Sequence, residues 1–202
     1  MAVQTLNRYF FMSNKTVIIL NGPPGSGKDT IADFIAAEFN AEHLRFKTKL
    51  YAITALINNL DFDEFMKIAT DQNTKDSVKL ARGLTARQLI IETSENVIKP
   101  YYGKEYFGND VGDSILKSDK SLFVLSDGGF PEELSSMIGV GCLNYSDVVI
   151  VKLYRTGCNF DNDSRTYFNE AILHPDIRVI PFINDLELYP MYDAIKQLVR
   201  SL

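Results

Sequence analysis

The stretch Thr16–Thr30, which reads TVIILNGPPGSGKDT, decides the fold. It begins with a run of β-branched and aliphatic residues, and such a run predicts a buried strand. A glycine-rich turn, Gly22–Lys28, follows directly. The next segment has apolar residues spaced for one face of a helix, namely Ile31, Phe34, Ile35 and Phe39. The sequence therefore predicts a strand, a tight turn and a helix in immediate succession.

This turn has the composition of a phosphate-binding loop. Gly22, Gly27 and Lys28 meet the spacing G-x-x-x-x-G-K. Glycines let backbone N–H groups approach an anion closely, and the helix N-terminus adds a partial positive charge. A lysine at this place reaches the β- and γ-phosphates of a nucleotide. We therefore expect ATP to contact Gly22, Gly25, Ser26, Gly27, Lys28, Asp29 and Thr30; the alternative is a glycine-rich turn without a ligand.

Composition and charge narrow the class of protein. The 202 residues suffice for one substantial domain, and a net charge of −5 argues against a broad nucleic-acid or anionic-membrane surface. No apolar run approaches the roughly 20 residues of a membrane span. Cys142 and Cys158 lack metal-ligand spacing, so free thiols in a reducing compartment are expected. We expect a cytoplasmic protein with an N-terminal appendage, residues 1–14, and a single domain, residues 15–202.

Charged residues follow two further predicted strands. Arg45, Lys47 and Lys49 come where the strand at residues 41–46 turns into a helix, and Asp127 ends the strand that begins at Leu122. Ligands of open α/β sheets bind at the carboxyl ends of the strands. We expect the three cations to bind substrate and Asp127 to lie near magnesium. The alternatives are a solvated charge cluster and a plain turn aspartate.

Residues about 60–118 form a predicted helical insertion. Within it, Thr85 and Gln88 have the spacing of a capping box at a helix start. Arg82 precedes this helix, and Arg87 and Gln88 lie in its first turn; the family resemblance described below makes all three candidate substrate-binding residues. The aromatic stretch Tyr101–Gly108 is expected to be a loop, which either stacks on a base or packs internally.

Two arginines bracket a polar segment after the strand predicted at residues 147–154. Arg155 and Arg165 flank turn-forming residues, which predicts a lid at about residues 155–175 whose guanidiniums neutralise phosphate charge. The alternative is a surface loop with solvated arginines. A last strand, Ile177–Phe182, then leads through Asn184 and Asp185 into a terminal helix.

The order of these parts resembles the P-loop nucleoside monophosphate kinases. The string SGKDTIADFI at residues 26–35 is most similar to the deoxynucleoside monophosphate kinases of tailed bacteriophages. The segments Leu84–Gln88 and Ser126–Glu133 resemble that family's substrate-side helix and strand-end motif. The resemblance implies an α/β, three-layer P-loop fold with a central, roughly five-stranded parallel sheet, a helical substrate-binding insertion and a short lid.

The resemblance also implies an activity. It is the transfer of the γ-phosphoryl group of ATP to a (deoxy)nucleoside 5′-monophosphate, with Mg²⁺, in the host cytoplasm if the protein is phage-encoded. A nucleoside monophosphate would be the small-molecule partner, and a homodimer is left open. The implied catalytic residues are Lys28, Arg87, Arg155, Arg165 and Asp127. Asp29 and Asp127 would lie near the metal, and Asn184 and Asp185 near the adenine of ATP.

The chain departs from the family pattern at three positions. Gly129 stands where an arginine is common, so the phosphate-binding arginine is expected at Arg82, Arg45 or Arg155. Leu186 replaces the glycine that follows the Asn-Asp pair. Asp29 replaces the usual residue after the lysine and must either face Mg²⁺ or the acceptor, which we favour, or cap backbone N–H groups. The alternative functions are a kinase of dephospho-coenzyme A or shikimate, and a nucleotide-binding switch or ATPase.

Overall fold

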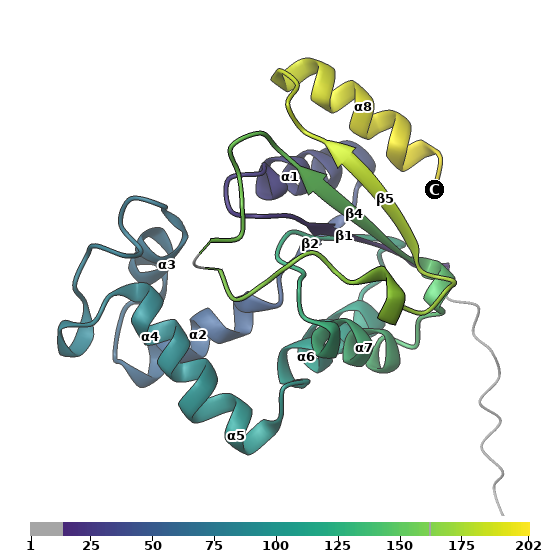
Figure 1. The fold of residues 1–202 in the computed structure, drawn as a ribbon. Helices are drawn as coiled ribbons and strands as arrows, with labels where there is room; N and C mark the ends of the chain where they lie inside the picture. The colour runs from purple at the N-terminus through teal and green to yellow at the C-terminus, as the bar shows by residue number, and fades with distance from the viewer. Residues whose placement is uncertain (1–13, 162) are drawn as a thin grey trace, which may run out of the picture.

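The computed structural model describes residues 14–161 and 163–202, so the predicted appendage lies outside the described residues except for Asn14. The described residues form one sheet of five parallel strands in the order β2-β3-β1-β4-β5 (Figure 1). The strands are β1 Thr16–Asn21, β2 Glu42–Leu44, β3 Leu122–Leu125, β4 Val148–Tyr154 and β5 Arg178–Ile183. The predicted α/β fold with a five-stranded parallel sheet is confirmed.

The strand that precedes the glycine-rich turn is the centre of this sheet. Ile18 of β1 is opposite Val124 of β3 on one side and Val149 of β4 on the other. All three side chains are buried. A parallel strand covered on both faces needs a continuous apolar sequence, which is why VIIL occurs here without polar interruption.

Helices cover both faces of the sheet and complete three layers (Figure 1). On one face, α1 Lys28–Phe39 and α8 Leu188–Arg200 pack against alternate residues of β1 and β4. On the other face, the sheet packs against α2 Lys47–Ile57, α6 Tyr106–Lys117 and α7 Pro131–Val140.

The segment between α2 and α6 covers most of the range 60–118 that is expected to form a helical insertion, and it is largely helical. The last helix of that range, α6, packs against the sheet. The segment before α6 has a small core of its own, in which Phe65 packs with Ala55, Ala69 and Ala86. The capping box predicted at Thr85 is present. Its elements are α3 Phe62–Thr70, the 3-10 helix η1 Ala81–Gly83, α4 Ala86–Glu92, the π-helix η2 Thr93–Ile98 and α5 Lys99–Tyr102.

One local prediction is wrong. The stretch Tyr101–Gly108 is mostly helical, because α5 runs to Tyr102 and α6 begins at Tyr106. Pro100 lies in the first turn of α5, where the missing N–H of proline is tolerated. The break between the two helices is confined to Gly103 and its neighbours, and Gly103 has a φ of 86°.

The remaining segments are short. The 3-10 helices η3 Tyr145–Asp147 and η4 Glu170–Ile172 flank β4 and the predicted lid. Both cysteines are free thiols, as expected. None of the helices in the described part of the chain is long and apolar enough to cross a membrane.

Candidate active site

The glycine-rich turn connects β1 to α1 and holds its lysine tightly. Lys28 is 7% exposed, and its Nζ donates hydrogen bonds to the carbonyl oxygens of Gly22 at 2.7 Å and Pro23 at 2.5 Å. Burial, and then the positive charge of Arg165, lower the pKa of Lys28 to about 8. The turn therefore presents a buried ammonium group at the N-terminus of α1, as a phosphate-binding loop requires.

The residue after β5 supports this loop from the side. Asn184 is 3% exposed, and its Nδ2 donates to the carbonyl oxygen of Ser26 at 2.8 Å. Gly27 has a φ of 91°, and a Cβ atom built on it would lie 2.5 Å from the same Nδ2. Only glycine combines this left-handed conformation with so close an approach. Asn184 therefore lies against the phosphate-binding loop.

Two further cations lie near Lys28, and each comes from a different segment. Arg165, from the segment between β4 and β5, donates through Nη1 to the carbonyl oxygen of Asp127 at 3.3 Å. Its Nε and Nη2 bind both carboxylate oxygens of Asp163 at 2.9 and 2.7 Å. Lys47 begins α2, and burial followed by the charge of Arg165 lowers its pKa. Lys28, Lys47 and Arg165 thus concentrate positive charge at the carboxyl edge of the sheet.

Carboxylates balance part of this charge. Asp127 accepts hydrogen bonds from the backbone N–H groups of Phe46 and Lys47, both at 3.0 Å, and so holds the start of α2. Glu133, in the first turn of α7, is 8% exposed. Burial and then the negative charge of Asp127 raise the pKa of Glu133 to about 8.

Asp29 lies in the first turn of α1 and does not cap backbone N–H groups. Its Oδ1 accepts hydrogen bonds from Arg45, through Nε at 3.3 Å and Nη2 at 3.1 Å, and from the Ser126 hydroxyl at 2.8 Å. None of the described residues hydrogen-bonds to Oδ2. Thr30, the next residue, is exposed.

The donor set fits magnesium brought by a nucleotide better than a site made by the protein alone. Within the described residues there is no group of three or more His, Cys, Asp or Glu side chains that could hold a metal ion. Mg²⁺ is commonly bound by one or two carboxylates together with substrate phosphates. Asp29 has an oxygen available for this role, whereas both oxygens of Asp127 already accept backbone hydrogen bonds.

Several predicted residues are engaged elsewhere and do not join this cluster. Arg82 pairs with Glu92 at 2.8 Å, and Lys49 pairs with Asp110 at 3.3 Å. The Gln88 side chain accepts the Thr85 N–H in the capping box. Their roles as substrate contacts remain predictions.

Two other predicted arginines lie at the borders of the cluster. The Nη1 of Arg155 donates to the carbonyl oxygen of Gly25 at 3.3 Å, so this side chain reaches the phosphate-binding loop. Arg87 pairs with Asp76 at 2.6 Å on the insertion. Burial and then the positive charge of Arg87 lower the pKa of Lys75, and the charge of Arg165 lowers it further. Asp163 and Arg165 both act on Lys75, so this part of the insertion lies within electrostatic range of the segment between β4 and β5.

Sequence reasoning missed a residue that holds part of the predicted lid segment in place. Asn21 is fully buried at the end of β1, and its Nδ2 donates to the carbonyl oxygens of Gly128 at 3.2 Å and Thr166 at 3.0 Å. Its Oδ1 accepts the Phe168 N–H at 2.9 Å. These contacts fix the chain on either side of Tyr167, directly after Arg165. The available signal was an amide residue that ends an apolar strand. Sequence reasoning also missed Asp163 and Glu133.

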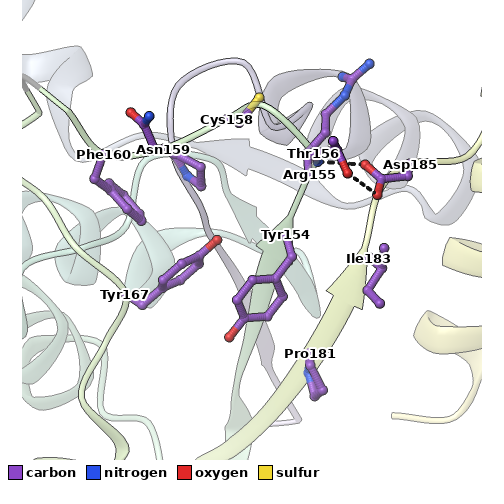
Figure 2. A pocket seen from close by; sticks show the side chains of 11 residues that line it. Tyr154, Arg155, Thr156, Cys158, Asn159, Phe160, Tyr167, Pro181, Ile183 and Asp185 are labelled. Carbon is purple, nitrogen blue, oxygen red and sulfur yellow. Dashed lines mark hydrogen bonds between the residues drawn. The ribbon is translucent and has the colours of Figure 1, made fainter.

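A pocket of about 670 Å³ adjoins the phosphate-binding loop (Figure 2). Aromatic side chains form much of its wall: Tyr154 and Tyr167 have ring centroids 4.8 Å apart, and Phe160 meets Tyr167 edge-on at 4.9 Å. Asp185, at its rim, accepts hydrogen bonds from the N–H and the hydroxyl of Thr156, both at 2.8 Å (Figure 2). The other lining residues are Pro23, Arg155, Cys158, Asn159, Pro181 and Ile183.

Comparison with known proteins gives one sequence relative of interest. The chain is 28% identical over 133 residues to a cytidylate kinase from Bartonella tribocorum. The match includes 55% of this chain and spans 61% of the length of that relative. No protein-family model matches the chain.

Several solved structures of kinases match the chain at low similarity. A sugar kinase from Janibacter sp. HTCC2649 gives a TM-score of 0.47 at 11% identity and covers 93% of each chain. A gluconokinase from Sinorhizobium meliloti 1021 gives 0.45 at 12%, with 92% of this chain and 93% of that one covered. A shikimate kinase from Bacteroides thetaiotaomicron gives 0.42 at 12%, with 92% and 97% covered. Such values indicate nothing about the substrate of this chain.

Proposed function

We propose that the protein transfers the γ-phosphoryl group of ATP to a (deoxy)nucleoside 5′-monophosphate and releases ADP and the nucleoside diphosphate. The observation that carries this proposal is the convergence of Lys28, Lys47 and Arg165 at the phosphate-binding loop. A switch protein needs cations for one nucleotide only. Here Lys47 and Arg165 extend the positive charge away from the loop and towards the helical insertion, as a second phosphate-bearing substrate requires.

The donor nucleotide would bind across the loop and the aromatic pocket. Lys28 and the loop amides would hold the β- and γ-phosphates, and the nucleoside would enter the pocket beside Pro23. Tyr154 and Tyr167 supply the flat apolar surface that a base needs for stacking, and a volume of about 670 Å³ suits a small-molecule site. Arg155 lies between the pocket and the loop, where a guanidinium can neutralise phosphate charge.

The transfer itself needs positioning and charge neutralisation more than proton transfer. The attacking atom is an oxygen of the acceptor phosphate, which is already ionised at neutral pH and needs no strong base. Its bond to the γ-phosphorus forms as the bond from that phosphorus to the β-phosphate oxygen breaks. Lys28, Lys47 and Arg165 would stabilise the charge on the transferred group and on the departing ADP.

Magnesium would neutralise phosphate charge when bound with ATP. Asp29 is the residue best placed to contact its coordination sphere, because Oδ2 of Asp29 has no hydrogen-bond partner among the described residues. Asp127 would act by fixing Lys47 and the start of α2, since its two oxygens hold backbone N–H groups there.

The test is an assay of ADP formation over a panel of acceptors. The panel should contain the ribo- and deoxyribonucleoside monophosphates, together with shikimate, gluconate and dephospho-coenzyme A as competing acceptors. We expect turnover with at least one nucleoside monophosphate and none with the other three. Turnover with shikimate, gluconate or dephospho-coenzyme A alone would replace the proposed acceptor. Tight ATP binding without ADP formation from any acceptor would overturn the kinase function.

A further inference from the structure

A chain of polar side chains leads from the outer side of α1 to the end of the phosphate-binding loop. Nδ1 of His43 lies 2.8 Å from Oδ1 of Asp33, and Nε2 of His43 lies 2.9 Å from the Ser126 hydroxyl oxygen. That hydroxyl oxygen lies 2.8 Å from Oδ1 of Asp29. The His43 ring and the Ser126 hydroxyl group are largely shielded from water, because the His43 side chain is 10% exposed and Ser126 is 2% exposed. Asp33, at the outer end, is 69% exposed.

The periodicities of one helix and one strand create this arrangement. Asp29 and Asp33 are four residues apart on α1 and so occupy the same helical face. His43 on β2 and Arg45 just beyond it are two residues apart and so point to the same side of the chain. His43 therefore meets Asp33, and Arg45 meets Asp29 one helical turn away.

Strand pairing brings the fourth member into place. β2 pairs with β3, with Leu44 opposite Leu125, so Ser126 emerges directly beside His43 and Arg45. From there its hydroxyl group can reach both His43 and Asp29.

The direction of each hydrogen bond follows from its acceptor. An ionised carboxylate only accepts, so Ser126 must use its one hydroxyl hydrogen for Asp29. The Ser126 oxygen is then free to accept from an Nε2–H group of His43. When the ring is protonated, its Nδ1–H group donates to Asp33. The groups that face the His43 ring are thus Asp33 and, through Ser126, Asp29 from α1, with Arg45 beside it on its own segment.

These contacts favour an ionised Asp29. Burial alone would raise the pKa of Asp29, but the Ser126 hydrogen bond and the charge and hydrogen bonds of Arg45 outweigh it and lower that pKa. When protonated, His43 acts in the same direction through its positive charge.

We propose that His43 is a positioning residue for the phosphoryl transfer: through Ser126 it fixes Oδ1 of Asp29 and so directs Oδ2 towards the bound nucleotide. This inference rests on the proposed kinase function. A residue that orients a ligand-contacting group through one intermediate typically contributes about 10- to 100-fold in activity or affinity.

The test compares substitutions that keep or remove the donor at Nε2. His43→Leu removes it, whereas His43→Gln keeps an N–H donor at a similar distance from the main chain. We expect His43→Leu to lower kcat about 10-fold with the KM for ATP within about twofold, and His43→Gln to retain most of the rate. The matched control is His174→Gln, because His174 is the second of the two histidines and stacks on Tyr145 at 3.8 Å. The control should keep wild-type kinetics.

Non-additivity identifies Asp29 as the group through which His43 acts. In an Asp29→Asn background, His43→Leu should cause no further loss of kcat. A second readout does not depend on activity: Asp29→Asn and Ser126→Ala should each shift the NMR resonance of the His43 ring Hε1 and leave that of His174 unchanged.

The outcomes separate this inference from the proposed function. If the wild-type protein turns over no nucleoside monophosphate, the proposed function is overturned. The shifts of the His43 resonance in Asp29→Asn and Ser126→Ala still test whether His43, Ser126 and Asp29 are connected. Normal kcat in His43→Leu beside a large loss in Asp29→Asn overturns the inference alone. The inference is also overturned if the loss of kcat in the double variant His43→Leu/Asp29→Asn is the product of the two single losses. If His43→Leu does not fold, Ser126→Ala takes its place in the same cycle.

Discussion

Arg165 fills the space in front of Gly129. A Cβ atom built on Gly129 would lie 2.8 Å from Cβ and 2.9 Å from Cγ of Arg165, which is too close for any side chain to coexist with it. The kinases that this chain resembles often have an arginine at the position of Gly129. We therefore predict that Arg165, from the segment between β4 and β5, supplies a guanidinium at this place, in addition to the expected candidates Arg82, Arg45 and Arg155.

Substitution of Gly129 should therefore act through Arg165. We expect Gly129→Ala to displace the Arg165 side chain and so to lower kcat/KM, as removal of that side chain should. For Arg165→Ala we expect kcat/KM to fall about 100-fold or more, because a phosphate-stabilising cation is lost. Steady-state kinetics on the nucleoside monophosphate measure both effects. Gly139→Ala is the matched control, because no atom lies within 4 Å of a Cβ built there.

The same relationship predicts a rescue. In Gly129→Arg combined with Arg165→Ala, the new side chain enters the space that the old one leaves, so part of the lost rate should return. Gly129→Arg alone should be worse than the pair, since two guanidiniums would then compete for one space. A pair no faster than Arg165→Ala by itself would contradict the equivalence of the two positions.

The lowered pKa of Lys28 predicts a pH dependence. Lys28 must carry its proton to attract the triphosphate, and its pKa of about 8 means that the charge is lost as pH rises through this value. We expect kcat/KM for ATP to be level below about pH 7.5 and to fall about tenfold per pH unit well above pH 8. Lys28→Ala should lower kcat/KM for ATP by orders of magnitude, and its pH profile should lack this fall above pH 8.

Glu133 could produce a similar limb, because its pKa is also raised to about 8. The control is therefore Glu133→Gln, in which the fall above pH 8 should persist. If the fall above pH 8 disappears in Glu133→Gln but persists in a weakly active Lys28 variant, then Glu133 and not Lys28 causes it.

The fold was predictable because its signals are local. The buried strands read as apolar runs, the capping box at Thr85 occupies four consecutive residues, and Gly22–Lys28 is contiguous. The loop expected at Tyr101–Gly108 is mostly helical instead. Pro100 lies in the first turn of α5, directly after the π-helix η2, which no sequence signal predicted.

The candidate site was predictable only where one segment builds it. Lys28 and Lys47 follow strands and were expected at the carboxyl edge. Asp163 and Glu133 escaped notice because their significance comes from burial beside Arg165 and Asp127, which are distant in the sequence. The pairing of Arg82 with Glu92, ten residues later, could not be inferred from spacing alone.

Glu133 should make the stability of the protein depend on pH. Its carboxyl group titrates near 4.5 in the unfolded chain and near 8 in the folded one, so between these values the folded state holds the extra proton. The free energy of unfolding must then fall as pH rises through this window. We expect Glu133→Gln to unfold like the wild type at about pH 4.5 and to be more stable by on the order of 4 kcal/mol at pH 8. Urea unfolding at both pH values measures the difference.

The neighbouring residue supplies the control for this experiment. Glu132 precedes Glu133 in the same helical turn but is exposed, so Glu132→Gln should change stability little at either pH. A Glu133→Gln variant whose advantage does not grow with pH would show that Glu133 is already ionised in the folded protein.

Asn184 should control the affinity for ATP through the loop that it supports. Its Nδ2 donates to the carbonyl oxygen of Ser26, and its Oδ1 is buried without a hydrogen-bond partner among the described residues. Asn184→Ala removes the support, and we expect the KM for ATP to rise about tenfold, the equivalent of one hydrogen bond of about 1.4 kcal/mol, with the KM for the acceptor unchanged. Asn184→Asp should be worse, because a carboxylate oxygen would face the Ser26 carbonyl.

Asn109→Ala, on the exposed side of α6, is the control. Equal rises in both KM values would mean that Asn184 maintains the whole edge of the sheet rather than the loop alone.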